Sequence, residues 1–210
     1  SPPDLQQQLK RELKNIICEY DRLIIAEGPP QTAHWAQNIW FDPQVISFTS
    51  ISEAAKKLKE LQKLWSFYPY KNIRRGTLIS EKLPYFSAKP IIFSSIPKAP
   101  LGSWTLLDPN TLLASPLCSS SFAQGEVHFQ ESKVPPSRAY LKLWEALTRI
   151  GVIPKPDDVC LEVGASPGSW TWVLQQLGSK VIAVDRALLD PSVSSLPNVT
   201  CLKKDAFSLK

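Results

Sequence analysis

A turn of small residues between an apolar run and a helical pattern is the part of this sequence best suited to chemistry. Residues 159–163 have the composition of a buried strand, residues 164–170 form the turn, and residues 171–177 have a helical pattern. In such a strand-loop-helix unit, the backbone N–H groups of the loop and the start of the helix face a ligand at the carboxyl end of the strand. The pattern therefore predicts a cofactor-binding loop.

An acidic residue, Asp185, ends the next apolar run, residues 181–184. An acid about twenty residues after the loop, at the tip of the second strand, is placed to accept hydrogen bonds from ribose hydroxyls. Gly178 is expected to end the intervening helix in a left-handed conformation. We therefore predict a βαβ unit that binds a nucleoside-containing cofactor. NAD is disfavoured, because its fingerprint needs glycine at two positions where Ser166 and Ser169 stand.

The rest of the chain must supply the elements that position this unit. At 210 residues and 43% hydrophobic content, the chain can bury real cores and has the size of one to two domains. Two prolines at 135 and 136 interrupt both helix and strand and mark a boundary. We expect an α+β region over residues 1–134 and an α/β domain over residues 135–210.

The amino-terminal region has alternating strand and helix signals. Ser50 and Glu53 form a capping box, which predicts a helix that begins at residue 51. Asp4 is expected to cap a helix over residues 5–17. Strand-like stretches are predicted at residues 22–26, 38–41, 45–48, 91–93, 103–107, 111–114 and 125–129.

A mild basic excess suits an anionic partner without requiring one. The net charge is +5 and the pI is about 9.0. Lysines 56, 57, 59 and 63 share one helical face, and aromatic and basic residues alternate over residues 65–75. This mixture is suited to stacking on RNA bases and contacting phosphates. The alternative is a solvated lysine face next to an aromatic turn that faces the core.

Other functional classes have little support in the sequence. The four cysteines lie far apart and no histidine has metal-ligand spacing, so we expect no metal site. No apolar run reaches the roughly 18–20 residues that span a bilayer, and the start of the chain has no secretory pattern. We expect a cytoplasmic protein without a membrane segment; the oligomeric state stays open.

Residues 138–150 predict one further helix. Its apolar stripe consists of Tyr140, Leu143, Trp144, Leu147 and Ile150, and Ser137 is placed to cap it. The opposite face carries Arg138, Lys142, Glu145 and Arg149. From periodicity alone this second face is a solvated one.

Two motifs together resemble a known enzyme class. The order acid-x-Gly-Ala-x-Pro-Gly-x-Trp over residues 162–170, with Ser-Arg-Ala-x-x-Lys-Leu over residues 137–143, is similar to the FtsJ/RrmJ class of S-adenosylmethionine-dependent RNA ribose 2′-O-methyltransferases. Within this class the chain is most similar to RlmM-type enzymes, which methylate ribosomal RNA and carry a THUMP-containing region before the catalytic domain. The resemblance implies a Rossmann-like methyltransferase domain over residues 135–210 and a THUMP-like region before it.

The resemblance also assigns roles to individual residues. It implies a catalytic role for Lys142 beside the acceptor ribose, contact of Asp185 with the cofactor ribose, and contact of Asp205 with the adenine amino group. It implies further cofactor contacts for Glu162, Gly164, Ala165, Ser166, Pro167, Gly168, Ser169 and Trp170. Ser169 departs from the family pattern, which has a glycine there. Alternatively, Trp170 packs its helix and Asp205 caps a turn.

Three functional hypotheses follow. The first is methyl transfer from S-adenosylmethionine to an RNA ribose 2′-hydroxyl, with ribosomal RNA as the expected substrate. The family's remaining catalytic acid, lysine and glutamate have no counterparts before Lys210, so we expect a longer native protein and an inactive 210-residue chain. The alternatives are a non-catalytic RNA-binding protein that keeps the fold and a small-molecule methyltransferase.

Overall fold

The computed structural model describes residues 2–29, 33–87, 89–93, 97 and 99–208, which belong to two units. The amino-terminal unit comprises residues 1–89 and 97–127, and the carboxy-terminal unit comprises residues 90–96 and 128–210. The second unit therefore includes residues 90–96, a segment from the middle of the chain. The functional boundary expected near residue 134 stays a prediction.

The amino-terminal unit begins with a short helical segment and a hairpin. The 3₁₀ helix η1 (Pro3–Leu5) leads into α1 (Gln6–Glu12), and β1 (Ile16–Tyr20) pairs antiparallel with β2 (Leu23–Ala26). The helix is shorter than predicted, because Leu13 is extended and Asn15 is left-handed with φ 52°. Asp4 does not cap α1; Leu5 is its N-cap residue and makes no side-chain hydrogen bond.

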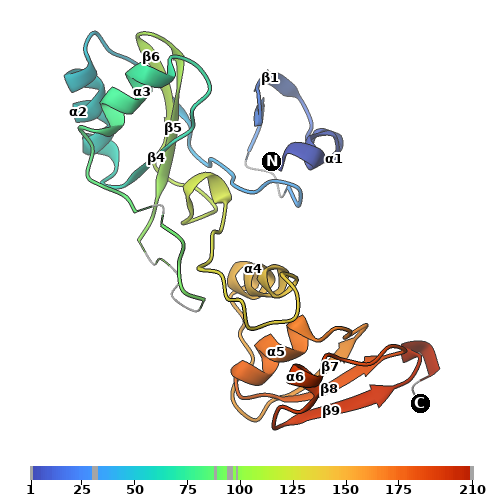
Figure 1. Ribbon diagram of the computed structural model, residues 1–210. Helices are drawn as coiled ribbons and strands as arrows, with labels where there is room; N and C mark the ends of the chain where they lie inside the picture. Colours follow the sequence, from blue (N-terminus) through green and yellow to red (C-terminus); the bar gives the residue numbers. More distant parts are fainter. Residues whose placement is uncertain (1, 30–32, 88, 94–96, 98, 209–210) are drawn as a thin grey trace. The chain divides into compact units, whose positions relative to one another are not determined.

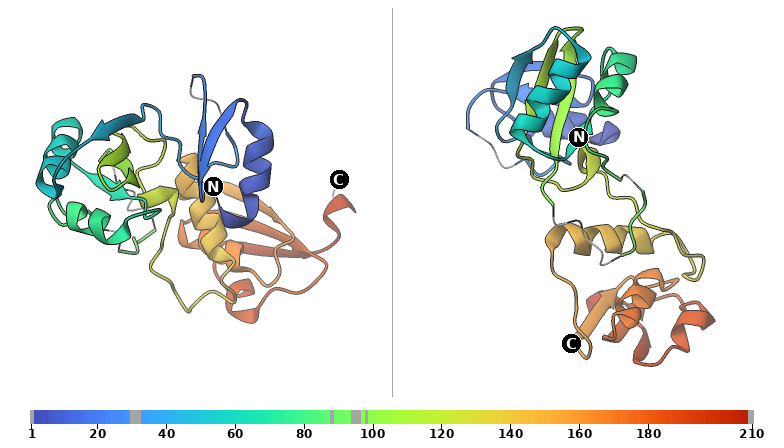
Figure 2. Two further views of the ribbon diagram at one scale, coloured as in Figure 1. Left: turned by 90° about the horizontal axis from the view of Figure 1, so that it is seen from above. Right: turned by 90° about the vertical axis from the view of Figure 1, so that its left-hand side faces the viewer.

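A four-stranded sheet forms the centre of this unit (Figure 1). Its strands are β3 (Gln44–Ser47), β4 (Trp65–Phe67), β5 (Gly102–Asp108) and β6 (Thr111–Ser115), in the order β3-β6-β5-β4. The strands predicted at residues 103–107 and 111–114 are confirmed as β5 and β6, which form an antiparallel hairpin, whereas β4 pairs parallel with β5. Helices α2 (Ile51–Leu61) and α3 (Ile73–Ser80) cover one face, and Figure 2 shows α2 lying across the strands.

The capping box at the start of α2 is confirmed with one change. The Ser50 side chain accepts from the Glu53 N–H at 3.1 Å. The Glu53 carboxylate accepts from the backbone N–H and the hydroxyl of Thr49, one residue earlier than expected. The Thr49 hydroxyl, the Lys57 ammonium and the Thr49 N–H together lower the pKa of Glu53 to about 2.

Three predicted strands are wrong. Residues 38–41 contribute only an isolated bridge between Trp40 and Cys118, and residues 91–93 contribute only a bridge between Ile91 and Phe129. Residues 125–129 do not form a strand, because the preceding 3₁₀ turn η2 (Ala123–Gly125) contains left-handed Gln124 and Gly125. Helix α3 was missed, since it begins after a left-handed Asn72 and its start resembles a loop.

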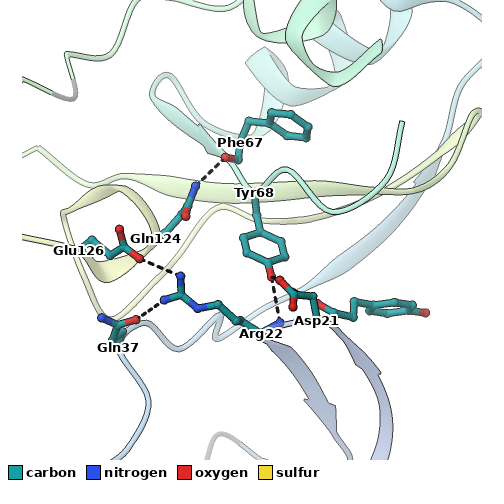
Figure 3. A network of polar contacts seen from close by, with 8 residues as sticks. Asp21, Arg22, Gln37, Phe67, Tyr68, Gln124 and Glu126 are labelled. Atoms are coloured by element: carbon teal, nitrogen blue, oxygen red, sulfur yellow. Dashed lines mark hydrogen bonds and ion pairs between the residues drawn. The ribbon is translucent and has the colours of Figure 1, made fainter. Parts of the chain in front are cut away.

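Polar contacts tie the hairpin to the sheet of the same unit (Figure 3). The Arg22 guanidinium donates to Glu126 at 3.0 Å and to Gln37 at 2.7 Å. The Tyr68 hydroxyl donates to Asp21 at 2.9 Å and accepts from the Arg22 backbone N–H. Burial of this hydroxyl raises the pKa of Tyr68 to about 12. The network therefore joins segments that are far apart in the sequence.

The carboxy-terminal unit has the predicted βαβ order and one further strand. Its parallel sheet, β7-β8-β9, consists of β7 (Val159–Val163), β8 (Lys180–Asp185) and β9 (Val199–Lys203). Helix α5 (Ser169–Gln176) connects β7 to β8, and α6 (Pro191–Ser194), which was not predicted, lies between β8 and β9. Gly178 is left-handed with φ 87°, as expected after the helix.

The two faces of this sheet differ. Helices α5 and α6 cover one face (Figure 1), where Ala165, Ala183 and Val193 form a buried cluster. On β7, Val159 is 67% exposed and Leu161 is 59% exposed. The alternation of β7 therefore places apolar side chains on an uncovered face.

Helix α4 (Tyr140–Ile150) packs through an aromatic cluster within the same unit. The Trp144 ring stacks on Phe93 with centroids 5.0 Å apart and meets Tyr140 edge-on at 4.7 Å. The predicted stripe is confirmed for its first turns but wrong for Ile150, which is 69% exposed. Ser137 is not the N-cap residue of α4; that residue is Ala139.

Candidate cofactor and catalytic site

The loop after β7 lies at the carboxyl ends of the parallel strands. The backbone N–H groups of Gly164 and Ala165 donate to the Val184 carbonyl at 2.9 and 3.3 Å, so the loop is fixed to the end of β8. Gly164 has φ 75°, and a Cβ atom added there would meet no atom within 4 Å. The loop therefore turns in a conformation that favours glycine and leaves open space beside its backbone.

The second glycine of the loop has a packing role. Gly168 has φ 110° and is the N-cap residue of α5. A Cβ atom there would lie 3.0 Å from a Val193 side-chain atom, so the glycine lets α6 approach closely. The Pro167 carbonyl accepts from the Asp190 N–H at 2.9 Å, and the Ser166 hydroxyl donates to the Leu188 carbonyl at 2.9 Å. The segment after β8 thus supports the loop.

Asp185 at the end of β8 reaches the loop directly. One of its carboxylate oxygens accepts from the Ser166 N–H at 2.9 Å, and the other accepts from the Ala187 N–H at 2.8 Å. These hydrogen bonds hold the pKa of Asp185 below its ordinary value, and the bond from the Ala187 N–H has the largest effect. A carboxylate has about four lone-pair positions, so Asp185 keeps acceptor capacity for the hydroxyls of a ligand.

Glu162 is a buried acid next to the loop. Its side chain, on β7, accepts a hydrogen bond from the hydroxyl of Thr171 in the first turn of α5, at 2.5 Å. Glu162 is 7% exposed and Thr171 is fully buried. Burial raises the pKa of Glu162, the Thr171 hydrogen bond opposes this, and the charge of Asp185 adds to the increase. The site therefore holds a carboxylate that a cationic ligand would stabilise.

Asp205 follows β9 at the same edge of the sheet. One carboxylate oxygen accepts from the Phe207 N–H at 3.0 Å, which caps the 3₁₀ turn η3 (Ala206–Ser208). The other oxygen is paired with the Arg186 guanidinium. The alternative predicted for Asp205, a turn cap, is therefore present in the structure. Its role toward a cofactor stays a prediction.

Lys142 lies on α4, whose start is attached to α5. The Trp170 indole donates to the Ala139 carbonyl at 2.8 Å, and the Ser169 hydroxyl bonds to Ser137. Lys142 is exposed. On the same face, Arg138 pairs with Glu131 and Arg149 pairs with Glu145. Within the described residues no ion pair of the Lys142 ammonium is seen.

The structure brings most of the predicted site residues to one edge of the sheet. Glu162, the loop residues 164–170, and Asp185 are connected by the contacts above, and Asp205 joins them through Arg186. Lys142 is linked to them through the start of its helix, where the Ala139 carbonyl accepts from both the Lys142 N–H and the Trp170 indole.

Sequence reasoning missed three contributors. Thr171 was an ordinary position of a predicted helix, and nothing local marks it as the partner of Glu162. Ser137 was expected to cap α4 but instead bonds Ser169. Arg186 had a weak signal, because it is a basic residue adjacent to the ribose-binding candidate Asp185.

Among the described residues there is neither a candidate metal centre nor a helix suited to span a membrane. No group of three or more histidine, cysteine, aspartate or glutamate side chains there is arranged to hold a metal ion. No helix among the described residues is long and apolar enough to cross a membrane.

Comparison with known proteins places this geometry in a family context. Residues 135–210 match the family described as FtsJ-like methyltransferase. A ribosomal RNA large subunit methyltransferase M of Halorhodospira halophila is 40% identical over 78 residues, which cover 36% of this chain and 23% of the relative. The corresponding protein of Stenotrophomonas maltophilia is 33% identical over 101 residues, covering 45% of this chain and 28% of the relative.

The matched part is a limited share of these proteins. The Xylella fastidiosa relative is 37% identical over 78 residues, or 34% of this chain and 22% of its own length. The chain thus spans about a quarter of the length of the curated relatives that it matches. The resemblance predicted from the two motifs is confirmed: residues 135–210 match the FtsJ-like methyltransferase family, and part of the chain is similar to ribosomal RNA large subunit methyltransferases M.

Proposed function

We propose that this protein transfers a methyl group from S-adenosylmethionine to a ribose 2′-hydroxyl of RNA, with ribosomal RNA as its substrate and the cytoplasm as its location. The observation that carries the proposal is the pairing of an ionised Asp185 with the Gly164 loop, in a segment that matches FtsJ-like methyltransferases. Similarity to proteins named ribosomal RNA large subunit methyltransferase M supports the choice of RNA.

The residues present fit the proposed cofactor. Asp185 would accept hydrogen bonds from its ribose, and the open space at Gly164 admits a ligand close to the backbone. The buried Glu162 would hold its cationic methionine end, because opposite charge offsets the cost of burying the carboxylate. Asp205 would accept a hydrogen bond from the adenine amino group, and its ion pair with Arg186 would open. When bound, S-adenosylmethionine supplies an electrophilic methyl group.

The chain's own contribution to the reaction is to align and activate the acceptor. A 2′-hydroxyl is a weak nucleophile at neutral pH. The Lys142 ammonium would orient it and lower its pKa or, once desolvated and neutral, accept its proton. Holding the two reactants in line can contribute on the order of 7–11 kcal/mol, so positioning supplies most of the acceleration.

The amino-terminal unit is proposed to recognise RNA as a THUMP-like region. Lys56 and Lys59 are exposed on α2, and Lys63 is exposed two residues after its end, not on the helical face that the sequence predicted. Lys56 pairs with Glu60 at the surface, whereas Lys57 pairs with Glu53 and donates to the Ser47 carbonyl. Trp65 cannot stack on a base, because it is 5% exposed and its indole donates to backbone carbonyls of α2 and the residue after it. The proposal therefore rests on phosphate contacts by the exposed lysines.

A longer protein is part of the proposal. The uncovered apolar face of β7, with Val159, Leu161 and Val163 more than half exposed, is what a further layer of the domain would bury. We therefore propose that the complete protein supplies this layer together with the remaining catalytic residues, and that the 210-residue chain alone does not transfer methyl groups.

Titration calorimetry and a methyl-transfer assay test the proposal. The complete protein is expected to bind S-adenosylmethionine and to label unmethylated large-subunit ribosomal RNA at a ribose 2′-oxygen. Cofactor binding without labelling of this RNA, but with labelling of a small molecule, would favour a small-molecule methyltransferase. RNA binding without cofactor binding would show a non-catalytic RNA-binding protein.

A further inference from the structure

All three hydrogen bonds of the Ser169 hydroxyl are made with Ser137, in the segment before α4. It donates to the Ser137 carbonyl at 3.1 Å and accepts from the Ser137 N–H at 3.0 Å. A hydroxyl has one proton, so in the third contact, at 2.8 Å, the Ser137 hydroxyl must donate to Ser169. Ser169 is 2% exposed, so water does not replace these bonds.

The neighbouring Trp170 makes a second attachment, and this one reaches Lys142. The Ala139 carbonyl accepts from the Trp170 indole at 2.8 Å and from the backbone N–H of Lys142 at 3.1 Å. One oxygen atom thus joins the cofactor-loop side of the site to the residue proposed to act on the acceptor. Ring contacts of Trp172 with Tyr140 and Trp144 hold the same two helices together further along.

The shape of Ser169 alone does not account for its contacts. An aliphatic replacement of similar size would fill the space but leave the Ser137 N–H without its partner in a buried place, which costs free energy. The hydroxyl therefore does more than fill a gap between α4 and α5.

We propose that Ser169 and Trp170 are positioning residues that fix the start of α4, and with it Lys142, relative to the cofactor loop. This inference rests on the proposed function, because it assigns Lys142 to the acceptor. Neither residue needs to touch the acceptor; both act by restricting where the Lys142 backbone lies. A displacement of the order of 1 Å at a reacting group lowers rates by up to about 100-fold.

Single-turnover methyl transfer at saturating cofactor tests the proposal in the complete protein. Ser169→Ala is expected to slow transfer to unmethylated large-subunit ribosomal RNA by about 10- to 100-fold. Trp170→Phe, which keeps a six-membered aromatic ring but removes the pyrrole part of the indole with its N–H donor, is expected to slow it less, in the same direction. Ser179→Ala is the matched control: it removes another buried hydroxyl of this unit, one that bonds the Lys155 carbonyl and not α4.

A double-mutant cycle separates positioning from a general structural role. If Ser169 acts through Lys142, adding Ser169→Ala to Lys142→Ala should cause no further loss of rate. If the rate losses of Ser169→Ala and Lys142→Ala multiply in the double variant, the positioning role is overturned. A Ser169→Ala rate within twofold of wild type would overturn it as well. If Ser169→Ala does not fold, the same cycle with Trp170→Phe decides. A wild-type protein that transfers no methyl group would instead refute the proposed function, so the two failures are distinguishable.

Discussion

The hydroxyl of Thr171 donates to the carboxylate of Glu162 in a place where both side chains are buried. The pair joins the first turn of α5 to the end of β7. Burial raises the pKa of Glu162 above its ordinary value of 4.5 despite this hydrogen bond. The apo protein therefore holds a carboxylate whose charged form is costly, beside the loop proposed to bind a cationic cofactor.

Glu162→Gln should make the folded unit more stable at neutral pH. Folding raises the pKa of Glu162, so above pH 4.5 the folded state keeps a proton that the unfolded state has lost. The free energy of unfolding therefore falls as the pH rises from 4.5 through the pKa of the folded state. The amide removes this dependence. Urea unfolding from pH 5 to 8 measures it, with Glu131→Gln at the surface as control. The variant should also bind S-adenosylmethionine more weakly; equal stability of variant and wild type at pH 7 would contradict the prediction.

Thr171→Val should have the opposite effect on stability. Valine matches threonine in shape but has no donor, so Glu162 loses a hydrogen bond in a buried site at a cost of about 1–3 kcal/mol. The loss should be larger at pH 8 than at pH 5, since the charged carboxylate needs the donor most. Denaturation of Thr171→Val in the Glu162→Gln background provides the check, because the difference between the two pH values should disappear there.

Asp185→Ala should weaken cofactor binding by roughly 1–3 kcal/mol, the scale of hydrogen bonds to a charged group. The variant also loses the acceptors for the Ser166 and Ala187 N–H groups, so its melting temperature must be measured in parallel. Titration calorimetry of the complete protein gives the affinity. Asp157→Ala, an exposed aspartate of the same unit, is the control. Unchanged affinity in Asp185→Ala would remove this residue from the cofactor site.

Lys142→Ala should impair methyl transfer without unfolding the protein. The side chain is exposed, so truncation should change stability by no more than about 0.5 kcal/mol. If the ammonium activates the 2′-hydroxyl, single-turnover transfer should slow by about 10²–10⁴-fold while cofactor affinity stays the same. Lys155→Ala, another exposed lysine of this unit, serves as control. Transfer at the wild-type rate would exclude the catalytic role.

Replacing Lys56, Lys59 and Lys63 together with alanine should weaken RNA binding and make it less dependent on salt. Each phosphate contact that is lost reduces the slope of log affinity against log salt by up to about 0.9. Binding of a large-subunit ribosomal RNA transcript at several salt concentrations gives this slope. An unchanged slope would show that these lysines do not contact RNA phosphates and belong to a solvated surface. Lys57 is left in place, because its bonds to Glu53 and Ser47 support the unit.

The sequence by itself determined the elements whose signals are local. The capping residue Ser50 and the left-handed Gly178 each act within a few residues, so the start of α2 and the end of α5 were predictable. The βαβ order and the placement of Asp185 beside the loop followed from the apolar runs, because parallel strands of this kind end at the same edge.

Tertiary structure alone decided which partner each of several side chains meets. Alternation of aromatic and basic residues left open whether Trp65 contacts RNA or faces the core, since this depends on the pairing of β4 with β5. Helical spacing did not reveal that Ile150 is left outside the aromatic cluster. The bonds of Thr171 to Glu162 and of Ser169 to Ser137 join residues from different elements, and only the packing of α5 against β7 and α4 brings them within hydrogen-bonding distance.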